Sequence, residues 1–407
     1  MKLLGKDRFK LIVILGALTA IGPLSIDMYL PGFKAIASDL QTSMSSVGLS
    51  LTSYFFGYAF GQLIYGPLLD RFGRRKPLVF GLVLYGISTL MCAISPHISW
   101  LIASRFFLSI GGCAGVVASR AIVRDYFDIT ESAKFFSALM LVMGLAPIIA
   151  PVLGSLITVY LGWRFIFYIL TIFTLLLLAA TMFYLPPVKG GDKTVSLKFG
   201  VIFRNYKSIL ANPVFLAYGL AGSVTYASLF AYISGSPFVY MKVFGLSELH
   251  YSWAFGINAM GLIIGSQTNR YWLKKTNNSK ITVYSFIALT TISVVLLLGT
   301  GFDYFSPFAS MFWIFCFVFF LGILNPNTVA LAMSPFSKNA GSASALMGSI
   351  QMAISALVSA LVSSTSNGSV LPMVIGMSVC ACIGLVVVVL YSLKKSSNHL
   401  PTAPEAS

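Results

Sequence analysis

The stretch GPLLDRFGRRK, residues 66–76, separates two long apolar runs and has a counterpart in the second part of the chain. The counterpart is GSQTNRYWLKK, residues 265–275, which repeats the first glycine, an Asp or Asn four residues later, the arginine after it and the final basic pair. Internal similarity of this kind is typical of a chain built from two similar halves. We therefore expect two helical bundles that face one another across a central cavity. A chance likeness between two basic loops is the alternative.

The chain is far more apolar than a soluble domain. Of its 407 residues 57% are hydrophobic and 9% charged, with a mean hydropathy of +0.88, whereas soluble domains have roughly a quarter charged residues. A bilayer helix needs about 20 apolar residues, and the first such run lacks the cleavage pattern of a signal peptide. We expect an all-α polytopic membrane protein with twelve transmembrane helices at 10–31, 46–68, 77–95, 100–122, 135–159, 164–186, 213–236, 249–269, 281–301, 307–330, 342–365 and 370–392.

The positive charge of the chain is unevenly distributed. The formal net charge is +16, which could indicate a nucleic-acid partner. Cytoplasmic loops of membrane proteins are, however, enriched in Lys and Arg. Of the 27 Lys and Arg residues, only Lys34, Arg164 and Lys242 are assigned to the outer side and Arg105 to the interior of a span, while Arg120 is counted with the cytoplasmic residues. This pattern predicts a multi-pass protein with both termini in the cytoplasm and no nucleic-acid partner.

The longest polar interruption is residues 186–213, PPVKGGDKTVSLKFGVIFRNYKSILANP, which begins with two prolines that cannot continue a helix. It divides the chain into halves of six spans each. We expect a six-helix bundle at 1–186, a cytoplasmic central loop at 187–212, a second six-helix bundle at 213–395 and a cytoplasmic tail at 396–407.

The residues that usually bind metals or nucleotides do not form a recognisable site. The five cysteines all fall in apolar spans without metal-ligand spacing, and the three histidines are scattered over loops and tail. The small-residue stretch AGSASAL is not a phosphate-binding loop. We expect no metal and no cofactor, and without a cluster of nucleophile, base or metal ligands in the membrane we expect no enzyme.

The loop at 66–76 has an ordered pattern beyond its charge. Gly66-Pro67 is expected to end a helix, Asp70 to start the next segment or pair with arginine, and Gly73 to allow a tight turn. The spacing G-x-L-x-D-R-x-G-R-R resembles the loop between helices two and three of the major facilitator superfamily. By this resemblance the cytoplasmic-gate motif comprises Gly66, Asp70, Arg71, Gly73, Arg74 and Arg75.

Other segments extend the resemblance over nearly the whole chain. Together they are similar to the twelve-span drug/proton antiporters, specifically the bicyclomycin and chloramphenicol resistance (Bcr/CflA) group. The segments are PLSIDMYLP (23–31), GQLIYGPLLDRFGRR (61–75), RFF (105–107), RDYF (124–127), APIIAPVLGS (146–155) and AGSASALMGSIQ (340–351).

The chain departs from the superfamily pattern in two places. Helix four usually reads Arg-x-x-Gln-Gly, whereas Arg105 is followed here by Phe-Phe-Leu-Ser. In helix five, small residues replace glycines of the antiporter pattern, which preserves close helix packing. The antiporter helix-five motif then comprises Ala146, Pro147, Ala150, Pro151 and Gly154.

Asp27 is the acidic residue that we place inside a span. An ionised carboxylate in a bilayer costs several kcal/mol unless it is paired or protonated. Its expected partner is Arg105, because at ~1.5 Å per residue both lie roughly 6–8 Å below the outer surface. Burial favours the neutral acid and the guanidinium favours the carboxylate, so a change in the cavity could load and release a proton. We predict that Asp27 and Arg105 couple transport to protons; a helix-capping Asp27 and an Arg105 that reaches the headgroups are the alternative.

Several polar and aromatic residues fall in spans at spacings that could line a cavity. Such walls give broad rather than selective binding, and hydrogen bonding between helices is the alternative for each. The candidate substrate-cavity residues are Tyr54, Tyr58, Gln62, Tyr226, Tyr232, Asn258, Asn325, Asn327 and Gln351.

The resemblance implies proton-coupled efflux of small amphipathic drugs across a bacterial inner membrane by alternating access. The expected partners are a small-molecule substrate, protons and the lipid bilayer, and we expect a monomer. An exporter of an endogenous metabolite, such as an amino acid derivative or siderophore, is the main alternative because a fold does not fix its cargo. A membrane-embedded receptor is disfavoured by the short loops.

Overall fold

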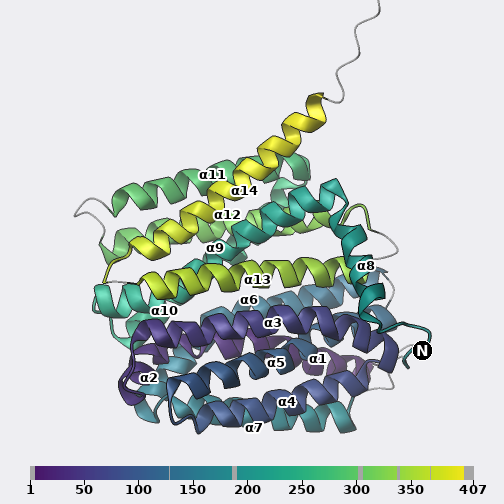
Figure 1. The fold of residues 1–407 in the computed structure, drawn as a ribbon, viewed down its shortest axis with the longest axis horizontal. Coiled ribbons are helices and arrows are strands. Elements are labelled where there is room, and N and C mark those ends of the chain that lie inside the picture. Colours follow the sequence, from purple (N-terminus) through teal and green to yellow (C-terminus); the bar gives the residue numbers. More distant parts are fainter. Residues whose placement is uncertain are drawn as a thin grey trace, which may run out of the picture.

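The computed structural model describes residues 5–127, 129–185, 190–300, 306–336, 340–366 and 368–397. These residues form helices and short connections and contain no strand (Figure 1). The predicted tail at 396–407 lies outside the described residues from 398 on, as do 186–189 at the start of the predicted central loop. The helices are α1 (Gly5–Asp27), η1 (Leu30–Gly32), α2 (Phe33–Asp39), α3 (Met44–Phe72), α4 (Arg75–Ala93), α5 (Ile98–Tyr126), α6 (Ile129–Tyr160), α7 (Arg164–Phe183), α8 (Phe199–Leu210), η2 (Phe215–Gly219), α9 (Leu220–Pro237), η3 (Phe238–Val243), α10 (Glu248–Trp272), α11 (Asn278–Gly299), α12 (Pro307–Met333), α13 (Ala340–Thr365) and α14 (Leu371–Ser397).

The long helices match the predicted spans, with ends that differ by several residues. Ten helices of the described chain are long and apolar enough to cross a bilayer. The other two long helices, α3 and α10, contain 29 and 25 residues and are more polar because serines, tyrosines and amides interrupt their apolar runs. The sequence prediction of an all-α membrane protein is confirmed, with twelve long helices at the predicted spans, of which ten have the length and composition of a membrane span.

Local sequence sets several helix ends. Ser43, Ser247, Asn277 and Ser306 each accept a hydrogen bond from the backbone N–H three residues later and so cap α3, α10, α11 and α12. Gly73 ends α3 with φ +81°, a conformation that favours glycine, as the tight turn predicted there requires.

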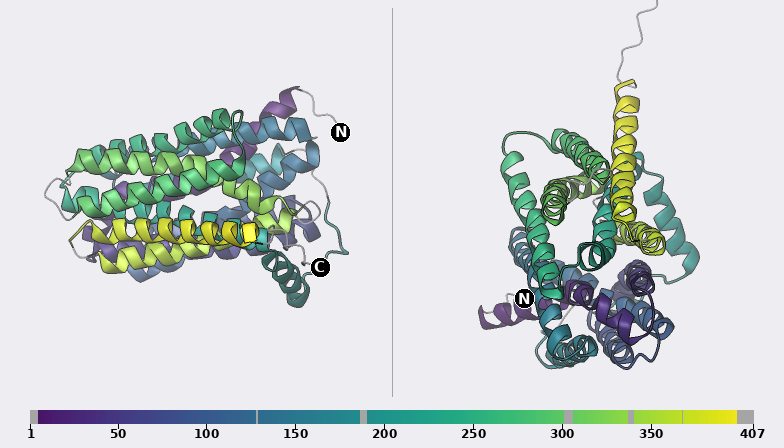
Figure 2. Two further views of the ribbon diagram at one scale, coloured as in Figure 1. Left: turned by 90° about the horizontal axis from the view of Figure 1, so that it is seen from above. Right: turned by 90° about the vertical axis from the view of Figure 1, so that its left-hand side faces the viewer.

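The helices form two packed sets (Figures 1 and 2). In the N-terminal set, α1–α7, α5 packs against α3 and α4, and α1 against α6; in the C-terminal set, α9–α14, α9 packs against α13 and α14, and α12 against α10 and α11. The sets meet along two helix pairs, α3 with α13 and α6 with α10. The right-hand view of Figure 2 looks along the helices and shows one set above the other.

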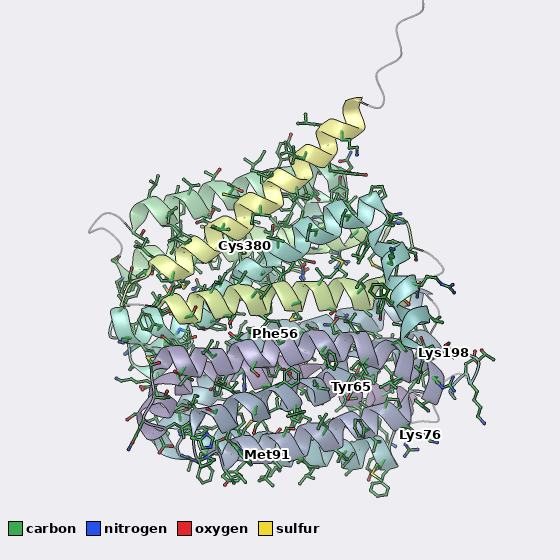
Figure 3. The ribbon with its side chains drawn as sticks, viewed as in Figure 1. Phe56, Tyr65, Lys76, Met91, Lys198 and Cys380 are labelled. Carbon is green, nitrogen blue, oxygen red and sulfur yellow. The ribbon has the colours of Figure 1, made fainter. Side chains whose placement is uncertain are left out.

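The two ends of the molecule differ in their charged residues. At one end, called here the α8 end, lie α8 and the labelled side chains of Lys76 and Lys198 (Figure 3). The opposite end, called here the α2 end, contains Lys34 of α2, Lys242 of η3 and the first residue of α7, Arg164. The three basic residues assigned to the outer side by sequence therefore lie together at one end.

Three local predictions were wrong. Gly66-Pro67 does not end a helix, because α3 continues to Phe72 with Pro67 inside it. The predicted loop at 187–212 contains a helix, α8. The first span does not end at residue 31, because after a short break the chain continues through η1 and α2 to Asp39.

Candidate functional site

Arg105 lies in the middle of the N-terminal set and is fully buried. Its guanidinium carbon lies 4.1 Å from the ring centre of Tyr29 and 4.9 Å from that of Tyr54, and Nη1 donates to the carbonyl of Ser25 at 2.9 Å. The Tyr29 hydroxyl is in turn 2.6 Å from Ser50 Oγ. A buried cation is costly without compensation, and two aromatic faces and a carbonyl supply it here.

The expected ion pair between Asp27 and Arg105 is not formed in this conformation. No salt bridge joins them among the described residues, and Arg105 contacts α1 through the Ser25 backbone instead. The Ser25 carbonyl lies only two residues before Asp27, so Arg105 still contacts the end of α1. The direction in which each side chain points around its helix could not be derived from depth.

Asp27 faces the opposite set of helices. It is the last residue of α1, is only 4% exposed and lies within electrostatic range of Tyr226, Tyr232 and Tyr251. These tyrosines belong to α9 and α10 of the C-terminal set. The carboxyl group therefore lies at the boundary between the two sets, where a relative movement of the sets would change its surroundings.

The predicted cavity residues divide into two kinds. Some are buried and form hydrogen bonds with other side chains. Asn258 Nδ2 donates to the Tyr232 hydroxyl at 3.0 Å, and Asn327 Nδ2 donates to Asn269 Oδ1 at 2.6 Å. Tyr54 is also buried, beside Arg105. The half-buried members of the set are Tyr58, Gln62, Tyr226, Asn325 and Gln351.

Aromatic rings connect the two sets near Asp27. Phe55 of α3 meets Phe230 of α9 edge to face, with ring centres 4.6 Å apart. Tyr226 packs on Phe230 at 5.7 Å, and Tyr58 stacks on Tyr54 at 6.2 Å. The centre of the boundary is thus largely aromatic, with one carboxyl group.

The loop after α3 forms a charge cluster at the α8 end. Arg74 bonds Asp70 Oδ1 and Asp125 Oδ2, each at 2.7 Å. Burial alone would lower the pKa of Arg74, but these two carboxylates raise it above its usual value, so the group stays charged. Arg71 donates to the carbonyls of Lys193 and Val195, and Arg75 to that of Met182.

Sequence reasoning missed Asp125 as a partner in this cluster. An acid at the end of the arginine-bearing helix α5 was a usable signal. Gly66, the first residue of the predicted motif, lies in the last two turns of α3, facing Ala345 of α13.

The helix-five motif lies where α6 contacts two other helices. Ser252 of α10 donates to the carbonyl of Pro151 at 2.9 Å. A Cβ at Gly154 would collide with the Met28 backbone beside Asp27, so glycine permits this close approach. Ala146 and Ala150 are buried, and Pro147 is half-buried. The motif therefore joins the Asp27 region to the C-terminal set.

Two cavities lie between the sets, one at each end. The cavity at the α8 end has a volume of about 400 Å³ and is lined by residues of α3, α5, α8 and α13, including Gln62 and Arg120. Arg120, which sequence reasoning counted with the cytoplasmic residues, is half-buried in α5. The cavity at the α2 end, about 570 Å³, includes Lys34 and Lys242 in its lining. In the described ranges no cluster of three or more His, Cys, Asp or Glu could hold a metal ion.

Comparison with known proteins places the chain in a family. Residues 15–360 match the Major Facilitator Superfamily. The chain is 38% identical to the uncharacterized MFS-type transporter YdgK of Bacillus subtilis over 93% of its length and 94% of the relative. It is 30% identical to a bicyclomycin resistance protein homolog of Haemophilus influenzae, over 93% of this chain and 95% of the relative. It is 29% identical to the multidrug resistance protein MdtL of Shewanella oneidensis, over 86% of this chain and 87% of the relative.

Two solved structures share the fold at low sequence identity. A D-xylose-proton symporter has a TM-score of 0.72 at 14% identity, covering 94% of this chain and 97% of that one. An inward-facing bacterial homolog of the human lysosomal transporter Spinster has a TM-score of 0.70 at 13% identity, covering 96% of both chains. The resemblance to the bicyclomycin resistance group is confirmed, and the chain belongs to the major facilitator superfamily as a multi-pass membrane transporter and not an enzyme.

Proposed function

We propose that this transporter exports small amphipathic drugs across a bacterial inner membrane in exchange for protons. Relatives named for bicyclomycin and multidrug resistance support the cargo class. The segregation of basic residues supports placing the α8 end and both termini in the cytoplasm. The chain acts as a monomer whose two six-helix bundles, divided at 187–212, part alternately at the two ends.

The observation that carries the proposal is the position of Asp27. It is a buried carboxyl group at the boundary of the two sets, without an ion pair to Arg105 in this conformation. An acid so placed favours its neutral form while the boundary is closed and its charged form when water enters. Movement of the sets therefore exchanges a proton between the two sides of the membrane.

Arg105 contributes to this cycle from the N-terminal set. Its Nε and Nη2 atoms are buried without a hydrogen-bond partner, and such donors gain most by meeting a carboxylate. We infer that Arg105 approaches ionised Asp27 in another conformation of the cycle and holds it until the proton is replaced. Each proton crossing ~100 mV supplies about 2.3 kcal/mol, which corresponds to roughly a 50-fold substrate gradient.

The charge cluster after α3 and the proline-containing segment of α6 control which end is open. The Arg74 cluster with Asp70 and Asp125 holds α3 to α5 at the α8 end, which supports a gate role for the motif at 66–75. Pro151 and Gly154 in α6 contact Ser252 and Met28, which supports a role in transmitting movement to the Asp27 region.

Flux in proteoliposomes tests the coupling. Purified protein is reconstituted, a pH gradient is imposed, and transport of chloramphenicol or bicyclomycin is measured together with proton movement. Asp27→Asn is expected to lower proton-driven flux at least tenfold, and Asp27→Glu to retain part of it. Asp39→Asn is the matched control, because Asp39 is an exposed carboxyl group that pairs with Arg164 within the N-terminal set.

The coupling assignment fails if Asp27→Asn transports drug with a normal proton exchange. A wild-type protein that carries no drug under any gradient, while metabolite release differs between deletion and overexpressing cells, would point to an endogenous cargo instead.

A further inference from the structure

Arg120 is a charged residue of the cavity at the α8 end, and the proton cycle does not use it. It lies on α5 fifteen residues after Arg105, or roughly 22 Å along the helix toward the α8 end. Its guanidinium lines the cavity there and lies within electrostatic range of Tyr58 and Tyr226. Tyr226 is also within electrostatic range of Asp27, so Arg120 and the coupling carboxyl group share a neighbour on α9.

The charge of Arg120 is not compensated by the protein. No hydrogen bond or ion pair joins it to another group in the described part of the chain. Asp70 and Asp125, the acidic residues of the cavity lining, are both bonded to Arg74. A half-buried guanidinium with five donors and no acceptor is a ready site for a planar acidic group.

The rest of the cavity wall suits an amphipathic molecule. Apolar side chains such as Leu69, Val117 and Ile202 stand beside the amides Gln62 and Asn205. The volume of about 400 Å³ lies within the usual range of small-molecule sites. An apolar body against these walls leaves an acidic end free to reach Arg120.

The opposite cavity has the same sign of charge. Lys34 of the N-terminal set and Lys242 of the C-terminal set both line it, and its lining contains no acidic side chain. Lys242 lies 5.1 Å from the Phe238 ring centre. A compound with an acidic group would therefore meet compensating cations on entry at the α8 end and on exit at the α2 end.

We propose that Arg120 binds an acidic group on the transported compound, so that the preferred substrates are amphipathic molecules with a carboxylate or sulfonate. The inference rests on the proposed export function and names the substrate class of that same path. Arg120 is then a specificity residue, distinct from the coupling residue Asp27.

Equilibrium binding tests the inference without any gradient or turnover. Purified protein in phosphatidylcholine nanodiscs is titrated with dansyl-phenylalanine and with dansyl-phenylalaninamide, which differ in the carboxylate, and binding is followed by fluorescence. The acid is expected to bind the wild type at least tenfold tighter than the amide. Arg120→Gln should remove this preference and Arg120→Lys should keep part of it. Arg204→Gln is the matched control, because Arg204 is exposed on α8 and does not line the cavity.

Each other result overturns the inference. Arg120 does not bind an acidic group if the wild type binds the acid and the amide equally, or binds neither probe. The same conclusion follows if the preference for the acid survives in a monodisperse Arg120→Gln protein. Displacement of the acid from the wild type by phosphatidylglycerol added to the nanodiscs would make a lipid headgroup the occupant. Because no pH gradient is present, the outcome is independent of the Asp27 flux test.

Discussion

Arg105 shows how a buried cation can be stable without a carboxylate. The ring faces of Tyr29 and Tyr54 and one carbonyl of α1 surround it, and the planar guanidinium can stack and donate at once, whereas an ammonium cannot do both. Because the Ser25 carbonyl lies two residues before Asp27, any movement of the α1 end also changes the surroundings of Arg105.

Arg105→Lys is therefore expected to destabilise the protein. The loss of stacking on two buried rings is worth about 2 kcal/mol, and it should appear as a lower midpoint of thermal unfolding in detergent. Arg164→Lys is the matched control, because Arg164 also lies over a ring, that of Trp163 at 4.4 Å, but its side chain is 35% exposed. The free energy of unfolding of the Arg164→Lys variant should differ from that of the wild type by no more than about 0.5 kcal/mol. Equal shifts in both variants would contradict the structural role of the aromatic cage.

Sequence reasoning found Asp27 and Arg105 but not their arrangement. The composition singled out the one acid and the one base deep in spans, and the rise per residue gave their depth. Which way a side chain points around its helix depends on packing between helices far apart in sequence. Arg120 was counted with the cytoplasmic residues, although it lies inside a helix that continues to Tyr126.

The helix α8 links the two sets at one end. Asn205 Nδ2 donates to Ser342 Oγ of α13 at 3.2 Å, and the Tyr206 hydroxyl donates to the Leu63 carbonyl of α3 at 3.3 Å. Burial raises the pKa of Tyr206, so its hydroxyl stays protonated as a donor. Pro67 has no N–H that could donate to the Leu63 carbonyl four residues earlier. The Tyr206 hydroxyl donates to this carbonyl instead.

This explains both errors of sequence reasoning near α8. A proline was taken to end α3, but a donor from another helix satisfies the carbonyl that it leaves free. The segment 199–210 was taken for a loop because of its basic residues, although Val201, Ile202, Tyr206 and Ile209 recur at helical spacing.

A double-mutant cycle tests the link between Pro67 and Tyr206. Tyr206→Phe is expected to leave the Leu63 carbonyl unpaired and to weaken the docking of α8 by about 1 kcal/mol, measured as faster amide hydrogen exchange over 199–210. In a Pro67→Ala background the new N–H can bond Leu63, so the same substitution should have little effect. If the two changes are additive, Tyr206 does not compensate for the proline.

The two sets repeat one another in sequence and in the position of their polar contacts. In the N-terminal set Arg74 joins Asp70 at the end of α3 to Asp125 in α5. In the corresponding helices of the C-terminal set, α10 and α12, Asn269 bonds Asn327. The repeat of 66–76 at 265–275 predicted this division, whereas the neutral pair in place of the charged cluster could not be predicted without the fold.

Alternating opening of the two ends should be blocked by cross-links along α3 and α13. A Cβ at Gly66 would lie 3.9 Å from the Ala345 Cβ near the α8 end, and one at Gly48 would lie 3.0 Å from the Ser363 Cβ near the α2 end. Disulfides span Cβ distances of about 3.5–4.5 Å, so both cysteine pairs are close enough to cross-link after small shifts.

Oxidation of Gly66→Cys/Ala345→Cys or of Gly48→Cys/Ser363→Cys is expected to lower substrate flux in proteoliposomes at least tenfold, with recovery after reduction. Each end must part once in every cycle, so either bond alone should stop the cycle. Ala231→Cys/Gly376→Cys joins α9 to α14 within one set, where the Cβ atoms would lie 3.2 Å apart, and should leave flux unchanged. Full cross-linking at either boundary pair with undiminished flux would mean that the sets do not separate at that end during transport.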